Sequence, residues 1–291
     1  MAAIAVSGLS KHYGDVRANE DLTFDVEAGE IFGYLGPNGA GKTTTIRTLL
    51  GFQSPTDGTA TVLGRDIRDE DALLEAKADI GYLPGDPGLD ENVTGEEYLD
   101  YQASLKGDAR REELLELFDP PLDRKIREYS RGNKQMLGIV QAFMHDPDLL
   151  IMDEPTSGLD PLKQATFNEF LRSERDRGKT VFFSSHILGE VRRVCDRVGI
   201  IRTGQLVALE DIDTLLTRGG KRVRIHATDD LDLDALGDGA VDAEQFDDGV
   251  QFTFTGDYND LVAFLSDHDV VDLEIEEPPI EDVFMHFYGE H

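Results

Sequence analysis

The residues with the clearest chemistry form a glycine-rich run behind a short apolar segment. Gly36-Pro37-Asn38-Gly39-Ala40-Gly41-Lys42-Thr43 matches the pattern GxxxxGK[ST] without a defect. Glycines let the backbone curve so closely that successive N–H groups can point at phosphate oxygens, and a helix starting at the end of the run adds its positive end. Lys42 can then reach the β- and γ-phosphates of a nucleotide, and Thr43 can hold Mg²⁺. The run predicts a phosphate-binding loop rather than a chance turn before a helix.

A pair of carboxylates supplies the second set of chemical groups. Asp153 and Glu154 follow the four apolar residues 149–152, which are typical of a buried parallel strand. Such strands deliver their carboxyl ends to the sheet edge where ligands bind. Asp153 can therefore hold Mg²⁺, directly or through water, and Glu154 can accept a proton from an attacking water. Alone, this run would be an ordinary core strand; with the phosphate loop it indicates nucleotide hydrolysis.

These groups require a framework that alternates strands and helices. Apolar patterning predicts strands over residues 2–7, 22–27, 31–35, 59–63, 149–152 and 180–184. It predicts helices over residues 43–50, 134–145 and 161–177, and a charged, helix-like stretch over residues 89–129. This alternation indicates an α/β fold in which helices cover the faces of a sheet.

The pattern changes after Gly219-Gly220. Residues 223–227, 241–245, 250–255 and 270–275 read as strands, and residues 257–265 and 280–288 read as helices. We expect a large domain over residues 1–214 and an accessory α+β domain of βαββαβ type over residues 215–291. The segment from Lys221 onward holds 20 of the 59 Asp and Glu residues but only 3 of the 28 Lys and Arg residues. The accessory domain is therefore expected to be acidic.

The net charge excludes whole classes of partner. The 291 residues carry a formal charge of −31. Coating a nucleic acid needs a basic footprint, so we expect no nucleic-acid partner, and a polybasic membrane anchor is excluded for the same reason. Only 9 of the 28 basic residues are Lys. An acidic, Lys-poor surface indicates adaptation to high salt, where ions screen the repulsion between carboxylates.

Cysteine content and hydropathy indicate a cytoplasmic protein. Cys195 is the single cysteine, cannot form an internal disulfide and is expected in the core. Residues 1–9 lack the basic region of a secretory signal. The uncharged stretches fall well short of the ~18 apolar residues that span a bilayer. We expect a chain that does not cross a membrane by itself.

Further motifs give the sequence a family likeness. Over residues 1 to about 214 it resembles the ATP-binding subunit of an ATP-binding cassette (ABC) transporter. The matching segments, in the family's order, are Tyr13, Gly36 to Thr44, Ser130 to Gln135, Asp153-Glu154, Ser157 to Asp160 and His186. The resemblance implies a RecA-like P-loop NTPase fold with a helical subdomain over about residues 86–146.

The resemblance also implies a role for each matching residue, with ATP and Mg²⁺ as ligands. Tyr13 would stack on adenine, and Glu154 and His186 would be catalytic, His186 through the γ-phosphate. Ser130 and Gly132 would face the γ-phosphate held by a partner copy, and Asp160 would lie in a loop that crosses the dimer interface. The remaining implied ligands of ATP or Mg²⁺ are Gly36, Pro37, Asn38, Gly39, Ala40, Gly41, Lys42, Thr43, Thr44 and Asp153.

Two segments depart from the family's pattern. Tyr129, Arg131 and Asn133 stand where the signature, usually LSGGQ, has Leu, Gly and Gln. Gly85 stands where the family usually has Gln, sometimes Glu, to link Mg²⁺ and water to the transmembrane partner. Asp86 is the candidate substitute as a metal ligand. Alternatively, backbone groups and water take the place of the missing side chain at this position. The coupling between the nucleotide site and the transmembrane partner would then be altered.

The end of the chain carries a shorter likeness. Residues 280–284, Ile-Glu-Asp-Val-Phe, are similar to the closing segment of drug-export cassettes of the daunorubicin- and bacitracin-resistance group. The alternative is an ordinary amphipathic terminal helix. The likeness implies a separate ABC-2 type permease subunit as partner. The resemblance of residues 1 to about 214 to ABC cassettes further implies head-to-tail pairing with a second copy or a related ATPase, on the inner face of the cell membrane.

Three other functions are less consistent with the sequence. A soluble cassette ATPase acting on nucleic acid or ribosomes usually has two cassettes or a long coiled coil and a basic surface, whereas one phosphate loop and a negative charge are found here. A GTPase or kinase would not need Tyr13, the signature and His186. A non-catalytic interaction protein would not need Lys42 and the Asp153-Glu154 pair.

Overall fold

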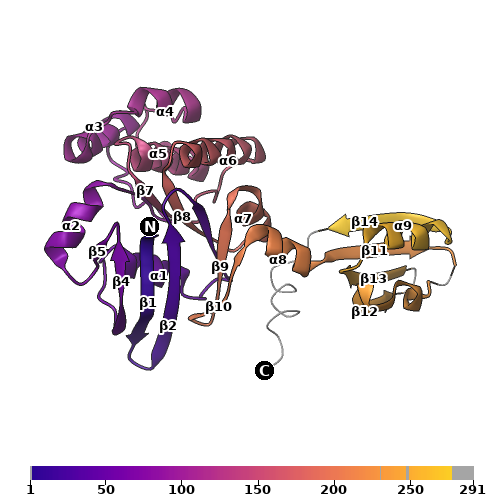
Figure 1. Cartoon of the computed structure of the whole chain (residues 1–291). Helices are drawn as coiled ribbons and strands as arrows, with labels where there is room; N and C mark the ends of the chain where they lie inside the picture. Colours follow the sequence, from indigo (N-terminus) through magenta and orange to yellow (C-terminus); the bar gives the residue numbers. More distant parts are fainter. Residues whose placement is uncertain (1, 230, 247–248, 277–291) are drawn as a thin grey trace. The chain divides into compact units, whose positions relative to one another are not determined.

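The computed structural model describes residues 2–229, 231–246 and 249–276. It divides the chain into two compact units, Met1–Leu209 and Glu210–His291 (Figure 1). The division lies upstream of the boundary near residue 214 that the sequence indicates. The first unit contains every residue singled out above for nucleotide chemistry. Within the described residues, each helix is too short or too polar to span a bilayer.

A six-stranded sheet forms the centre of the first unit. Its strand order is β10-β9-β3-β8-β7-β6. The bounds are β10 Gln205–Asp211, β9 Arg197–Arg202, β3 Ile31–Leu35, β8 Thr180–Ser185, β7 Leu149–Asp153 and β6 Ile80–Leu83. Strands β9, β3, β8, β7 and β6 run parallel. Every residue of β3, β7 and β8 is buried, which explains their unbroken apolar sequences. Because the strands are parallel, their carboxyl ends meet at one edge.

A second, antiparallel sheet packs near the first. Its order is β2-β1-β4-β5, with bounds β1 Ala2–Tyr13, β2 Val16–Glu27, β4 Asp57–Val62 and β5 Arg65–Asp66. One core joins the two sheets and includes helix α1 (Lys42–Leu49) through Ile46 and Leu49. The ring of Phe24 in β2 stacks 5.9 Å from Phe32 in β3 and 6.3 Å from Phe182 in β8. This aromatic stack fixes the strand that leads into the phosphate loop.

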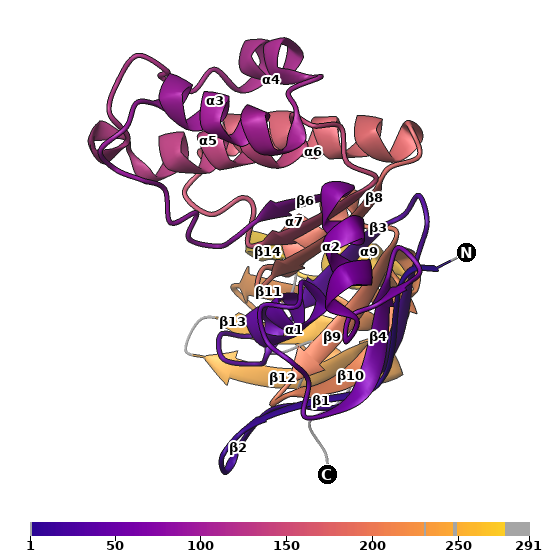
Figure 2. The same cartoon turned by 90° about the vertical axis from the view of Figure 1, so that its left-hand side faces the viewer.

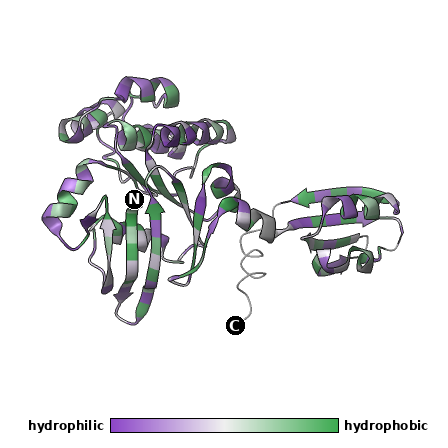
Figure 3. Ribbon diagram, viewed as in Figure 1, coloured by the Kyte–Doolittle hydropathy of each residue, from purple (hydrophilic) through white to green (hydrophobic). Residues whose placement is uncertain are grey.

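The remaining helices of this unit lie around the parallel sheet. Their bounds are α2 Glu70–Ala78, α3 Gly95–Lys106, α4 Arg111–Phe118, α5 Arg131–Phe143, α6 Pro161–Asp176 and α7 Leu188–Val194, with a 3₁₀ turn at Ile126–Glu128. Helices α3, α4, α5 and α6 gather at one end of the unit in Figure 2. Their mixed hydrophobic and hydrophilic colouring in Figure 3 fits helices with one face on the core.

Several elements differ from the sequence-based expectation. The stretch 89–129, which the sequence indicates to be helix-like and interrupted by Pro120-Pro121, contains α3 and α4 with a loop between them and irregular chain after the two prolines. The prediction missed α2 and the strands β6, β9 and β10. Strand β6 has four residues, and a Cβ on its Gly81 would lie 2.2 Å from the Ala142 carbonyl oxygen. A strand of four residues in which close packing requires a glycine shows almost no hydrophobic periodicity in the sequence.

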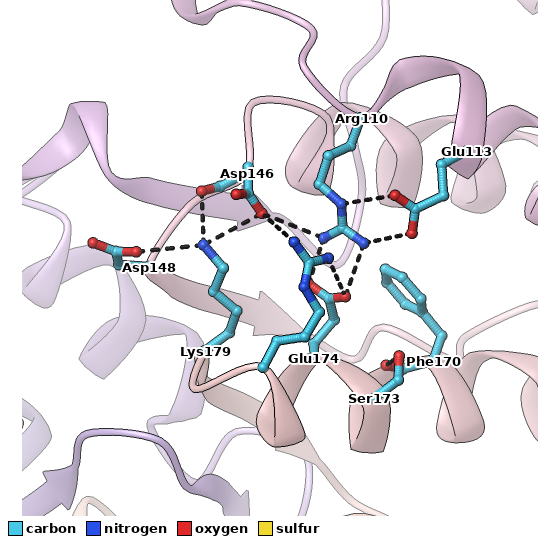
Figure 4. Close-up of polar contacts among 9 residues, drawn as sticks. Arg110, Glu113, Asp146, Asp148, Phe170, Ser173, Glu174 and Lys179 are labelled. Atoms are coloured by element: carbon cyan, nitrogen blue, oxygen red, sulfur yellow. Dashed lines mark hydrogen bonds and ion pairs between the residues drawn. The ribbon is translucent and has the colours of Figure 1, made fainter.

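A buried ion-pair cluster fastens the helical region to the sheet (Figure 4). Arg110, which precedes α4, donates to both carboxylate oxygens of Glu174 in α6, at 2.5 and 2.9 Å. Both side chains are almost fully buried. The same guanidinium holds Glu113 and lowers the pKa of that carboxyl by hydrogen bonding. Arg177 also pairs with Glu174 at 3.1 Å. The charges are thus matched where α4 and α6 meet.

The second unit is a small antiparallel sheet with helices. After α8 (Ile212–Gly219), the strand order is β12-β13-β11-β14. The other bounds are β11 Lys221–Ala227, η2 Leu233–Gly239, β12 Ala240–Phe246, β13 Gly249–Phe254, α9 Tyr258–Ser266 and β14 Val270–Glu276. Apolar residues of β11 and β13 pack on Leu261 and Phe264 of α9. The element after β11 is a 3₁₀ segment rather than the expected α-helix. The helix predicted over residues 280–288, with the drug-export likeness, lies outside the described residues.

Candidate active site

The glycine-rich loop connects β3 to α1 and lies close to neighbouring backbone. A Cβ on Gly36 would lie 2.4 Å from the Ile201 carbonyl oxygen, and one on Gly41 would lie 2.4 Å from the Ala18 carbonyl oxygen. Gly41 also has a φ of 109°, a conformation that side chains disfavour. The Gly36 N–H donates to the Ser185 carbonyl at 3.1 Å. Glycine is therefore required at both ends of the loop, which lies against β8 and β9.

Lys42 lies beneath this loop. Its side chain is 6% exposed, and its ammonium donates to the carbonyl oxygens of Gly36 at 2.7 Å and Pro37 at 3.2 Å. The Glu154 carboxylate lies 3.8 Å away. Burial lowers the pKa of Lys42, and the charges of Glu154 and Asp153 oppose that shift. A cation is thus held at the position where an anionic ligand of the loop would bind.

Asp153 is held by hydroxyl groups on both sides. Thr43 donates from Oγ1 to Asp153 Oδ2 at 2.7 Å, and Ser184 donates to Oδ1. Asp153 ends β7 and is paired in register with Ser184 of β8, so the sheet sets this contact. Magnesium prefers oxygen ligands and often keeps only one or two protein ligands beside phosphates and water. The Thr43 and Asp153 oxygens fit that preference. Among the described residues, no cluster of three or more His, Cys, Asp or Glu side chains offers a separate all-protein metal cage.

Glu154 is turned out of the strand toward His186. Its φ is 50°, in the left-handed region that is uncommon for residues other than glycine. Its N–H donates to the Ser184 carbonyl at 3.1 Å, which holds this conformation. His186 Nδ1 lies 3.1 Å from Glu154 Oε1. Backbone strain of this kind is a feature of functional sites, where the surrounding structure enforces it.

One pocket of about 580 Å³ gathers most of these groups. The expected site residues that line it are Asn38, Gly39, Gly41, Lys42, Thr43, Thr44, Asp86, Asp153 and Glu154. The sequence analysis did not single out Arg17, Arg47, Tyr82 and Thr203, which also line it. Its volume lies in the ordinary range of ligand pockets, roughly 300–1,000 Å³.

The departure at Gly85 falls beside the carboxylate pair. A Cβ on Gly85 would lie 3.3 Å from the Asp153 carbonyl oxygen and 3.7 Å from its carboxylate oxygen Oδ2. A longer side chain at this position would therefore reach the Asp153 carboxylate. Asp86 lines the pocket, but its Oδ1 accepts the Gly88 N–H at 3.4 Å within its own turn.

Tyr13 is linked to the loop's helix but does not line the pocket. Its hydroxyl donates to Gln53 Oε1. Gln53 Nε2 in turn donates to the Thr44 carbonyl at 3.0 Å and to Thr48 Oγ1 at 2.9 Å. The Tyr13 side chain is about half exposed. Its ring is thus tied to α1 while much of its surface stays open.

The signature segment starts helix α5 and packs on the loop that follows Glu154. Ser130 caps the helix by accepting the Asn133 N–H at 3.2 Å. A Cβ on Gly132 would lie 2.8 Å from the Gly158 carbonyl oxygen, and Arg131 donates to Ser157 Oγ at 2.6 Å. The buried Gln135 donates to the Pro155 carbonyl at 2.7 Å. Arg131, a departure from the family pattern, therefore has a structural partner here.

Ser130, Gly132 and Asp160 are not among the residues that line the 580 Å³ pocket. Asp160 caps α6, because its Oδ1 accepts the Lys163 N–H at 3.0 Å and Pro161 follows. Both segments present the N-terminal end of a helix, as a phosphate-binding surface would. Within one chain, the phosphate loop and the Asp153-Glu154 carboxylates thus line the same pocket, whereas the signature segment lies outside it.

Sequence reasoning also missed three residues that hold the site residues in place. Ser184 holds both Asp153 and Glu154, Gln53 holds Tyr13, and Glu190 hydrogen-bonds Thr156 and Ser185. The signal for Ser184 is its place at the end of a buried run next to the strand of Asp153. Gln53 and Glu190 carry no local signal, since their partners come from distant segments.

The sequence matches known proteins along most of its length. The family model for ABC transporters matches residues 19–157. The chain is 32% identical to an uncharacterized ABC transporter ATP-binding protein, YhaQ, of Bacillus subtilis, covering 98% of each chain. It is 33% identical to the bacitracin transport ATP-binding protein BcrA of Bacillus licheniformis, covering 98% of this chain and 97% of that one. It is 35% identical to the Nod factor export ATP-binding protein I of Rhizobium johnstonii, covering 99% and 95%.

Solved structures give the same result for the first unit. The ATP-binding subunit of an ABC transporter superposes with a TM-score of 0.67 at 33% identity, covering 73% of this chain and 91% of that one. A dimeric cassette bound to ADP and phosphate has the same fold, with a TM-score of 0.66 at 21% identity, covering 72% and 98%. The P-loop NTPase fold expected from the sequence is confirmed. The protein belongs to the ABC transporter ATP-binding subunits, and it is an ATPase that drives an ABC transporter.

Proposed function

We propose that two copies of this chain bind MgATP between them and that hydrolysis drives an ABC-2 type export permease. One observation carries the proposal: Lys42, Thr43, Asp153 and Glu154, from two distant segments, surround a single pocket with contacts of 2.7 to 3.8 Å. A phosphate-binding cation, a hydroxyl–carboxylate pair and a proton acceptor are the groups that phosphoryl transfer to water requires. ATP is the substrate of this site.

Each residue has a role that its position supports. The N–H groups of Gly39, Gly41, Lys42, Thr43 and Thr44 bind the phosphates, and Lys42 neutralises the charge on the β- and γ-phosphates. Thr43 and Asp153 hold Mg²⁺, with Asp86 as a further candidate ligand. When bound, the ion neutralises phosphate charge. Glu154 accepts the proton of the attacking water, and His186 contacts the γ-phosphate and, at 3.1 Å, orients Glu154.

The second copy would complete the site. Helix α5 begins at Arg131 and carries no acidic residue in its first turn, so its N-terminal end favours an anion. Ser130 and Gly132 at this end lie outside the chain's own pocket. Head-to-tail pairing would bring them to the γ-phosphate bound by a partner, with Asp160 beside them. The partner is a second copy or a related ATPase.

The likeness to relatives supports export as the direction. Two relatives matched over nearly their full length are named for bacitracin transport and Nod factor export. By this analogy the chain binds an ABC-2 type permease, a separate subunit, on the cytoplasmic face of the cell membrane. ATP-driven closing and opening of the dimer would then move the permease.

The variant Glu154→Gln tests the proposal. The amide cannot accept the proton, so we expect ATP turnover to fall about 10²–10⁴-fold while ATP binding persists. Size-exclusion chromatography with light scattering should show an ATP-dependent dimer of this variant. Glu169→Gln, at an exposed position of α6, is the matched control and should behave as wild type. Wild-type turnover in Glu154→Gln would contradict the assignment.

A further inference from the structure

The carboxylate of Glu190 joins the two loops that carry Glu154 and His186. Glu190 lies on the short helix α7, which follows His186. Thr156 donates from Oγ1 to Glu190 Oε1 at 2.5 Å, and Ser185 donates from Oγ to Glu190 Oε2 at 2.6 Å. Hydroxyl-to-carboxylate hydrogen bonds of this length are of the strong, charge-assisted kind. One carboxylate oxygen therefore holds the loop that follows Glu154, and the other holds the end of β8, directly before His186.

Both donors stand next to groups of the candidate site. Thr156 lies two residues after Glu154, and Ser185 directly precedes His186. The Ser185 carbonyl also accepts the Gly36 N–H of the phosphate loop at 3.1 Å. The Gly36 contact uses the Ser185 backbone and not its hydroxyl, so a movement of the Glu190 carboxylate would shift the proton acceptor and the histidine more directly than the phosphate loop.

A small cavity places these residues around one space. It has a volume of about 230 Å³ and is lined by Glu154, Thr156, Ser185, His186 and Glu190, among others. Glu190 is not among the residues that line the larger pocket that holds Lys42. Its carboxylate thus faces the two catalytic candidates without reaching the phosphate-binding side.

We propose that Glu190 is a positioning residue for ATP hydrolysis: by holding Thr156 and Ser185 it maintains the contact between Glu154 and His186. The inference rests on the proposed function, because it takes these two residues as the groups that act on water and the γ-phosphate. Catalytic groups must be held within about 0.5 Å of their productive geometry, and supporting hydrogen bonds provide that precision. Nucleotide affinity, set by the loop and Lys42, should not depend on Glu190.

The full-length chain with Glu190→Gln provides the test. The amide oxygen can accept one hydroxyl hydrogen, but the NH₂ group must donate to the other hydroxyl, which reverses that bond and removes the negative charge from both contacts. We expect kcat for ATP to fall at least tenfold, with KM and the affinity for a fluorescent ATP analogue within twofold of wild type. Thr156→Val and Ser185→Ala each remove one donor and should lower kcat less. Glu169→Gln is again the control.

A double-mutant cycle separates positioning from a general loss of structure. If Glu190 acts through Thr156, the pair Glu190→Gln/Thr156→Val should have the kcat of Glu190→Gln alone. Wild-type kcat in Glu190→Gln would overturn the inference, as would equal losses of kcat and nucleotide affinity. If Glu190→Gln does not fold, wild-type kcat in both Thr156→Val and Ser185→Ala would overturn it. These results differ from failure of the proposed function, which would appear as an inactive wild type or an active Glu154→Gln.

Discussion

Thr43 and Asp153 lie 110 residues apart in the chain, yet the Thr43 hydroxyl donates to the Asp153 carboxylate at 2.7 Å. The contact joins the start of α1 to the end of β7, which are the phosphate-binding and carboxylate-bearing segments. It also brings together the two side-chain oxygens that fit a magnesium ion.

Replacing Thr43 by Val should weaken the binding of the Mg²⁺ ion that ATP turnover requires. The substitution keeps the shape of the Thr43 side chain but removes the oxygen that would bind the ion beside Asp153. We expect the Mg²⁺ concentration for half-maximal ATP turnover to rise at least tenfold, measured by phosphate release. Thr43→Ser keeps the hydroxyl and should stay near wild type. An unchanged Mg²⁺ dependence in Thr43→Val would remove Thr43 from the metal site.

Replacing Lys42 by Met should remove tight nucleotide binding. Burial lowers the pKa of Lys42, which means that its charge is held at an energetic cost. Removing the ammonium relieves that cost but leaves the carboxylates of Glu154 and Asp153 without their counter-charge and the Gly36 carbonyl without its donor. We expect Lys42→Met to unfold in urea at a midpoint no higher than that of wild type, while affinity for a fluorescent ATP analogue falls at least tenfold. Retained affinity would contradict the role of Lys42 in phosphate binding.

His145 should make the fold sensitive to mild acid. Burial, assisted by the charge of Lys106, lowers the pKa of His145 to about 4 from 6.5. Between pH 6.5 and 4, His145 therefore binds a proton in the unfolded chain but stays neutral in the folded chain. The corresponding stability is complete above pH 6.5 and is lost as pH falls toward 4. Its size is on the order of 1–3 kcal/mol, because one unit of pKa difference corresponds to about 1.4 kcal/mol and the site is only partly buried.

The variant His145→Gln cannot take up that proton. The free energy of unfolding in urea should therefore fall less for His145→Gln than for wild type as the pH is lowered from 7.5 to 4.5. Comparing the two chains at each pH cancels the contribution of the many carboxylates. A difference that stays constant across this range would show that His145 does not contribute to acid sensitivity.

The ion pair between Arg110 and Glu174 should matter far more than the neighbouring one with Glu113. Glu174→Gln leaves the buried guanidinium of Arg110 without its main counter-charge, and we expect a loss of about 3–5 kcal/mol in unfolding free energy. Glu113 is 59% exposed, so Glu113→Gln should cost at most about 1 kcal/mol. Chemical denaturation measures both. Equal losses would show that burial does not set the strength of these pairs.

Salt should stabilise the chain. With a net charge of −31, repulsion between carboxylates is large and is screened more fully as the Debye length falls below about 10 Å above 0.1 M salt. We expect Tm to rise from 0.1 M to about 3 M KCl, where the screening length is below ~3 Å. Sorbitol at matched osmolality controls for exclusion of solutes. The same Tm in both solutes, or full stability in dilute buffer, would contradict a high-salt adaptation.

The parts of the fold that the sequence predicted have strong local signals. The fully buried strands β3, β7 and β8 appear as unbroken apolar runs, and glycines and capping residues mark the starts of α1, α5 and α6. Strands β6, β9 and β10 and helix α2 were missed. The strands are short or only partly buried and therefore have weak periodic patterns. Helix α2 does have a local signal, since Asp69 caps it and Glu70 and Asp71 occupy its first turn, and the sequence analysis overlooked it. The antiparallel pairing of β11 with β13 and β14 was likewise not stated in advance, since register between distant strands has no local signature.

The sequence alone determined the chemical groups of this protein: a phosphate loop, a pair of carboxylates and a histidine, each marked by its own short run of residues. Tertiary structure decided how these groups meet. The parallel pairing of β7 with β8 places Ser184 on Asp153, the left-handed turn at Glu154 directs that side chain to His186, and Glu190 bridges their loops. Contacts of this kind join segments distant in the chain, so they depend on the packing of the sheet and helices and leave no pattern in the local order of residues.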